Sequence, residues 1–154
     1  MTSLDVGKPA PDFELRDQHG ATTSLSSYRG VKAVVVMFYP FAFSRVCTGE
    51  LRDVLDGLPA FVSEDVQLLA VSCDPMFALR AFAEQEGIKF PLLSDFWPHG
   101  EVARAYGVLN TERGCADRST FIVDRRGDLR WMVHNAMADP RDLAEQRDVL
   151  ARLA

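Results

Sequence analysis

Residues 33–39 are Ala-Val-Val-Val-Met-Phe-Tyr, a continuously apolar segment rich in β-branched side chains. A strand buried on both faces has this composition, and such strands are typical of parallel sheets. Val66–Ser72 has the same character, and apolar residues recur at helical spacing between the two segments, from Val46 to Leu58. Gly57-Leu-Pro59 would end that helix. The three segments predict a right-handed βαβ unit with parallel strands.

Further elements are expected on both sides of this unit. Pro11–Gly20 begins as a short strand and turns at its end, and Thr22–Leu25 returns beside it. After the second buried strand, the sequence predicts a helix over Pro75–Glu86. The Asp74 side chain would cap its free N–H groups, Pro fits its first position, and Gly87 would end it.

The remaining third of the chain predicts two helices and a β-hairpin. Pro98–Tyr106 is expected to be a short helix, and Asp139–Leu153 a terminal amphipathic one. Ser119–Asp124 and Leu129–Val133 flank the turn Arg125–Asp128 and predict antiparallel strands. The order of elements is that of an α/β, thioredoxin-like fold: a central mixed β-sheet flanked by helices, with an N-terminal β-hairpin extension.

Length and composition indicate a single globular domain over residues 1–154. Hydrophobic residues make up 47% and charged residues 25%, which excludes a disordered chain. The longest apolar run, residues 33–43, is interrupted by Pro40 and is too short to span a bilayer. Residues 1–8 lack the apolar core of a secretory signal, so we expect a cytoplasmic protein.

Charge and cysteine spacing exclude two further classes of site. The chain has 17 basic and 22 acidic residues and a net charge of −5, so nucleic acid is not an expected partner. Cys47, Cys73 and Cys115 are an odd number of widely spaced cysteines. They match neither a zinc site nor a disulfide framework, and no metal or other cofactor is expected.

The segment that leaves the first buried strand carries the candidate chemistry. Cys47 falls in the first turn of the following helix, where unpaired N–H groups and the helix dipole favour a thiolate. Ser44, three residues earlier, would lie on the same side. Arg118 precedes a strand that, if antiparallel to the first, starts at the same sheet edge and brings a cation to the sulfur. The alternatives are a buried, unreactive Cys47 and a solvated Arg118.

Four segments carry a resemblance to a known family. Pro40-x-x-x-Ser44-x-x-Cys47 resembles the active-site motif of the peroxiredoxins, Pro-x-x-x-(Thr/Ser)-x-x-Cys. Val6–Phe13 and Arg118–Asp124 are also similar to that family. Leu93–Val108, with its Ser-Asp-Phe-Trp-Pro-His, resembles the one-cysteine peroxiredoxins of the AhpE type. The resemblance covers roughly Val6 to Trp131.

The resemblance implies a thiol peroxidase that reduces hydrogen peroxide and organic hydroperoxides. Cys47 would attack the peroxide and become a sulfenic acid, in a pocket that Pro40 shields from water. Ser44 and Arg118 would hold the two peroxide oxygens. Ser44 stands where the family more often has Thr; it keeps the hydroxyl but loses the methyl that restricts the rotamer. Glu50 is a candidate residue of the substrate pocket and is expected to pair with an arginine, across the site or at a subunit contact.

The sulfenic acid must then be reduced. The helix after Cys47 has no second cysteine, and the last cysteine of the chain is Cys115. The resemblance therefore implies an external reductant: a low-molecular-weight thiol such as mycothiol, with a glutaredoxin-like or thioredoxin-like partner. Cys73 and Cys115 are the possible internal resolving thiols; the alternative is that Cys73 is a packed residue and Cys115 a loop thiol. We expect no internal disulfide after peroxide treatment.

Four aromatic residues have three possible uses: Phe41, Phe43, Phe96 and Trp97 would line a substrate pocket, form core, or meet a second subunit of a homodimer. The histidines, which are widely separated, are expected at the surface. Two other functions stay open. A thioredoxin-like disulfide reductase needs a second thiol where Ser44 stands, and a non-catalytic peroxide sensor or chaperone would oxidise Cys47 without turnover.

Overall fold

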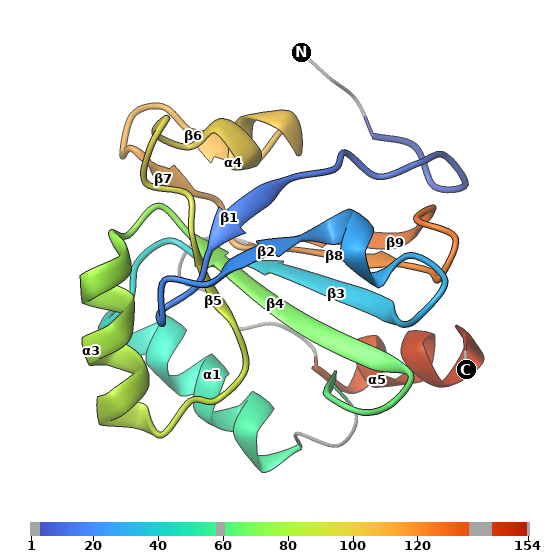
Figure 1. Ribbon diagram of the computed structural model, residues 1–154, viewed down its shortest axis with the longest axis horizontal. Coiled ribbons are helices and arrows are strands. Elements are labelled where there is room, and N and C mark those ends of the chain that lie inside the picture. The colour runs from blue at the N-terminus through green and yellow to red at the C-terminus, as the bar shows by residue number, and fades with distance from the viewer. Residues whose placement is uncertain (1–3, 58–60, 136–142, 154) are drawn as a thin grey trace.

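The computed structural model describes residues 4–57, 61–135 and 143–153. In these residues, seven strands form one mixed sheet in the order β2-β1-β5-β4-β3-β8-β9, and β6 and β7 form a separate small hairpin (Figure 1). The strands are β1 (Glu14–Arg16), β2 (Thr22–Ser24), β3 (Ala33–Phe38), β4 (Val66–Ser72), β5 (Leu92–Ser94), β6 (Leu109–Asn110), β7 (Cys115–Ala116), β8 (Ser119–Val123) and β9 (Leu129–His134).

The helices lie on both sides of this sheet. They are the 3₁₀ helix η1 (Leu25–Tyr28) and the α-helices α1 (Arg45–Asp56), α3 (Met76–Glu86), α4 (Glu101–Ala105) and α5 (Leu143–Leu153). In Figure 1, α1, α3 and α5 lie below the sheet, and α4 lies above it. None of the helices in the described parts of the chain has the length and apolar character needed to cross a bilayer.

The central strands confirm the predicted βαβ unit. β3 and β4 are parallel, with Ala33 opposite Val66 and Phe38 opposite Val71. On its other side, β3 pairs with β8 in antiparallel orientation. The N-terminal hairpin of β1 and β2 and the β8–β9 hairpin are also present as predicted. The fold is the expected thioredoxin-like α/β arrangement.

Alternate residues of β3 point into two separate cores, because successive side chains of a strand face opposite sides. Val35 and Met37 pack on one side with residues of three helices, among them Leu51 of α1, Phe82 of α3 and Leu150 of α5. Val34 and Val36 pack on the other side against α4 and the N-terminal segment. Both faces of β3 are therefore buried, which explains its unbroken apolar sequence.

The structure corrects four details. The predicted order lacked the short β5, which pairs with β4 in parallel, and the β6–β7 hairpin. Helix α4 starts at Glu101, later than the predicted Pro98. Helix α3 starts at Met76, its N-cap is Pro75, and no side chain caps it, so the predicted capping role of Asp74 is wrong. Of the predicted terminal helix, residues 139–142 lie outside the described residues.

Candidate active site

The site lies at the edge where β3 and β4 end and β8 begins. The register places Phe38, the last residue of β3, opposite both Val71 of β4 and Ser119 of β8. Segments that continue past this edge therefore meet there: the loop from Tyr39 to Ser44, the turn after Ser72, and the chain that enters β8. The carboxyl ends of parallel strands are where open α/β sheets gather reactive groups.

Cys47 is the third residue of α1 and has no exposed surface. Ser44 is the N-cap: its carbonyl oxygen accepts a 2.9 Å hydrogen bond from the Thr48 N–H, and its hydroxyl makes no capping hydrogen bond. The free N–H groups of a first helical turn favour an anion there.

Arg118 is the residue of β8's entry segment that contacts the sulfur. Its Nη2 donates a 3.3 Å hydrogen bond to Cys47 Sγ, and its Nη1 forms an ion pair with Glu50 Oε1. The side chains of Arg118 and Glu50 are only 2% and 4% exposed, which excludes the solvated alternative for Arg118. A buried guanidinium requires compensating negative charge, and Glu50 is placed to supply it.

The loop between β3 and α1 is held from two directions. Pro40 is buried, as a residue that shields the sulfur from water must be. Phe43 adopts a φ of 67°, a left-handed conformation that a bulky L-residue adopts only at a cost, and its ring packs edge-on against Phe82 at 5.0 Å. Asp74 Oδ2 accepts a 2.8 Å hydrogen bond from the Ala42 N–H.

Asp74 is thus part of the site, whereas the sequence pattern predicts that it caps a helix. An Asp before a Pro is a common helix opening, and that local pattern suggested a cap. The signal that points to its real position is its place just beyond the end of β4, at the same sheet edge as Cys47.

Cys73 and Cys115 are buried near this edge as free thiols. Cys115 opens β7, so it is not a loop thiol. Burial raises the pKa of Cys73 to about 12, with the negative charge of Asp95 adding to the shift. Burial also raises the pKa of Cys115, and Asp117 raises it further. Both thiols therefore stay protonated near neutral pH. A protonated thiol is a poor nucleophile.

The four aromatic residues are not core. Phe41, Phe43, Phe96 and Trp97 are 41%, 49%, 46% and 81% exposed. Phe41 and Phe43 belong to the loop that leads to Ser44. Phe96 and Trp97 line a different groove, of about 390 Å³, with residues of β1 and β2, and Cys47 is not among its lining residues.

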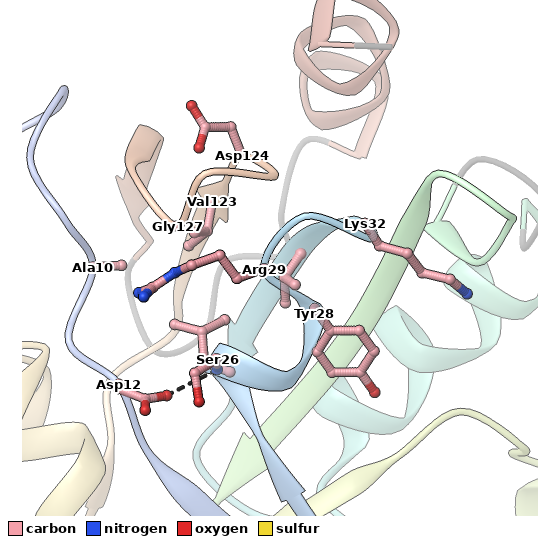
Figure 2. Close-up of a pocket in the computed structure, with 11 residues that line it drawn as sticks. Ala10, Asp12, Ser26, Tyr28, Arg29, Lys32, Val123, Asp124 and Gly127 are labelled. Carbon is pink, nitrogen blue, oxygen red and sulfur yellow. Dashed lines mark hydrogen bonds between the residues drawn. The ribbon is translucent and has the colours of Figure 1, made fainter.

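A second small cavity lies at the opposite end of β3. Figure 2 shows Arg29 and Lys32 beside it, and the Ser26 N–H donates to Asp12 Oδ1 at 2.9 Å. Its volume is about 10 Å³, enough for about one water molecule. His19, His99 and His134 are exposed. Within the described ranges, His, Cys, Asp and Glu side chains do not form a group of three or more suited to a metal ion.

Comparison with known proteins finds relatives of one family, by sequence and by structure. Residues 6–132 match the AhpC/TSA family. Alkyl hydroperoxide reductase E of Mycobacterium tuberculosis is 47% identical over 150 residues, covering 97% of this chain and 98% of its own length. A putative peroxiredoxin of Synechocystis is 36% identical, and the match covers 96% of this chain and 77% of that protein. Among solved structures, Mycobacterium bovis AhpC superposes with a TM-score of 0.84 and 31% sequence identity, over 99% of both chains. A reduced 2-Cys peroxiredoxin of Plasmodium vivax superposes with a TM-score of 0.84 and 27% identity, over 95% of this chain and 80% of that one.

The buried ion pair predicts a large stability effect. We expect Glu50→Ala to lower the free energy of unfolding by about 3–5 kcal/mol, because it leaves the Arg118 charge buried without its carboxylate. Asp65→Ala is the matched control: it removes the partner of Arg125 from an ion pair that is half exposed, and should cost less than about 1 kcal/mol. Urea unfolding measures both. Equal losses of unfolding free energy in the two variants would contradict the larger stability effect expected for the buried Arg118–Glu50 pair.

Proposed function

The chain belongs to the AhpC/TSA family of peroxiredoxins and is a thiol-dependent peroxidase, and we propose that Cys47 is the sulfur that attacks the peroxide. The observation that carries this proposal is the 3.3 Å hydrogen bond from Arg118 Nη2 to Cys47 Sγ in the first turn of α1. A cation and a helix N-terminus both stabilise the thiolate, which is the nucleophilic form.

The reaction proceeds by attack of the Cys47 thiolate on one oxygen of the hydroperoxide. The S–O bond forms as the O–O bond breaks, and the second oxygen leaves as an alkoxide or hydroxide that takes up a proton to give an alcohol or water. The sulfur is oxidised to a sulfenic acid. Arg118 and the Ser44 hydroxyl are the donors that stabilise the developing negative charge on oxygen, and buried Pro40 excludes water.

We propose that an external thiol completes the cycle. Its sulfur attacks the sulfenic acid, a mixed disulfide forms as water leaves, and a second thiol releases Cys47. Two properties support this over an internal resolving cysteine: Cys73 and Cys115 are both buried, and burial raises the pKa of each thiol. A low-molecular-weight thiol such as mycothiol, or a glutaredoxin-like or thioredoxin-like protein, is the proposed reductant.

Exposed aromatic side chains support two further proposals. Phe41 and Phe43, beside Ser44, favour organic hydroperoxides by offering them apolar surface. Trp97 and Phe96, with Phe77 at 70% exposure, are large apolar side chains that a second copy of the chain would cover in a homodimer. Sedimentation velocity tests the dimer.

The free state of all three cysteines supports a cytoplasmic, reducing location.

Replacement of the nucleophile tests the main proposal. Cys47→Ser should lower the rate of peroxide consumption with added thiol by about a thousandfold or more, because a hydroxyl at this position is not ionised. Circular dichroism should remain that of the wild type. Cys73→Ala is the matched control and should keep most of the activity. Sustained peroxide consumption by Cys47→Ser would refute the proposal, and oxidation of the wild type without turnover on any thiol would indicate a sensor.

The identity of the resolving thiol can be tested by peptide mapping. After one equivalent of peroxide, mass spectrometry should find Cys47 as a sulfenic acid and no peptide that links it to Cys73 or Cys115. Addition of a low-molecular-weight thiol should then give a mixed disulfide at Cys47. A cross-linked pair of peptides, formed faster than the mixed disulfide, would contradict the external cycle.

A further inference from the structure

We propose that Asp74 is a positioning residue for the peroxidase reaction, which acts by holding the loop that carries Pro40 and Ser44. This inference rests on the proposed function of Cys47. It starts from the hydrogen bond that Asp74 Oδ2 accepts from the Ala42 N–H at 2.8 Å, between residues 32 positions apart in the sequence. Ala42 lies midway between Pro40 and Ser44, so a fixed Ala42 restricts both.

The Asp74 carboxylate is itself held firmly. Its Oδ2 also accepts a 2.8 Å hydrogen bond from the Ser72 hydroxyl, and the Asp74 N–H donates to the same hydroxyl at 3.3 Å. The Asp74 carbonyl oxygen accepts a 2.7 Å hydrogen bond from the Ser94 hydroxyl of β5. Asp74 therefore joins the ends of β4 and β5 to the loop, and hydrogen bonds to an ionised acceptor are stronger than neutral ones.

The loop needs such an anchor because one of its residues is strained. Phe43, directly between Ala42 and Ser44, has a φ of 67°. A bulky side chain keeps this conformation only where the surroundings fix it from both sides. On one side the Phe43 ring packs on Phe82 of α3, and on the other Asp74 holds the Ala42 N–H.

The carboxylate is not needed for helix α3, since that helix has no side-chain cap. Among the hydrogen bonds of the described residues, the one to the Cys47 sulfur comes from Arg118, and none joins Asp74 to Cys47. Loss of the Asp74 side chain should therefore affect the placement of Ser44 and Pro40 around the peroxide, while the reactivity of the thiolate itself is retained.

Two rates measured on the same variants distinguish these effects: peroxide reduction by stopped flow, and alkylation of Cys47 by iodoacetamide, which does not need the Ser44 hydroxyl. Asp74→Ala should slow peroxide reduction about tenfold to hundredfold, the range expected when donors near the reacting atoms are displaced. Alkylation should stay within about twofold of the wild type. Asp74→Asn keeps an acceptor oxygen for Ala42 and should restore most of the peroxide rate. Asp17→Ala is the control and should react like the wild type, because the Asp17 carboxylate also accepts backbone hydrogen bonds, from the His19 and Ala21 N–H groups, but lies in the turn between β1 and β2.

A double-mutant cycle tests whether Asp74 affects the reaction through the position of Ser44. If Asp74 acts through Ser44, the loss in Asp74→Ala/Ser44→Ala should be smaller than the product of the two single losses. Should Asp74→Ala not fold, Asp74→Asn and Asp74→Glu give the same comparison, with Glu expected to be slower because its carboxylate is displaced by one methylene. An unchanged peroxide rate in Asp74→Ala, or an equal fall in both rates, would overturn the proposal. Failure of the proposed function would be visible separately, as sustained peroxide consumption by Cys47→Ser.

Discussion

The hydrogen bond between the Arg118 guanidinium and the Cys47 sulfur is the interaction on which the site depends. A buried cation is unfavourable unless negative charge surrounds it. Glu50 supplies one carboxylate from the same helix, one turn after Cys47, and in the proposed mechanism the Cys47 thiolate is the second negative group beside Arg118. In this proposal the three groups stabilise each other, and the buried cation favours the reactive form of the sulfur.

The sheet makes this contact possible. Because β8 runs antiparallel to β3, its first residue lies beside the last residue of β3, and Arg118, one position earlier, reaches the start of α1. A parallel β8 would place Arg118 at the opposite edge of the sheet, near the small cavity beside Lys32 (Figure 2). The two buried faces of β3 fix its register, since a shift by one residue would exchange the two cores.

The sequence predicts those parts of the fold that depend on local pattern. The apolar segments of β3 and β4, the helix between them and the β8–β9 hairpin all follow from composition and spacing, and the position of Cys47 follows from them. Partners across the fold are harder to predict. Asp74 has the local pattern of a helix cap, but an N–H group 32 residues away binds it. The sequence does not predict strand β5, because three residues are too few to show a period. Trp97, a candidate for the substrate pocket, instead lines another groove.

The most direct test is the rate at which iodoacetamide alkylates Cys47 at pH 7 in the wild type and in Arg118→Met, which keeps the bulk of the side chain and removes its charge. The account predicts that the wild type reacts faster than Arg118→Met by about tenfold or more, because a neighbouring cation favours the thiolate by that order. Arg125→Met, at an exposed ion pair, should react like the wild type. Equal rates in Arg118→Met and the wild type would contradict the claim that Arg118 keeps Cys47 reactive.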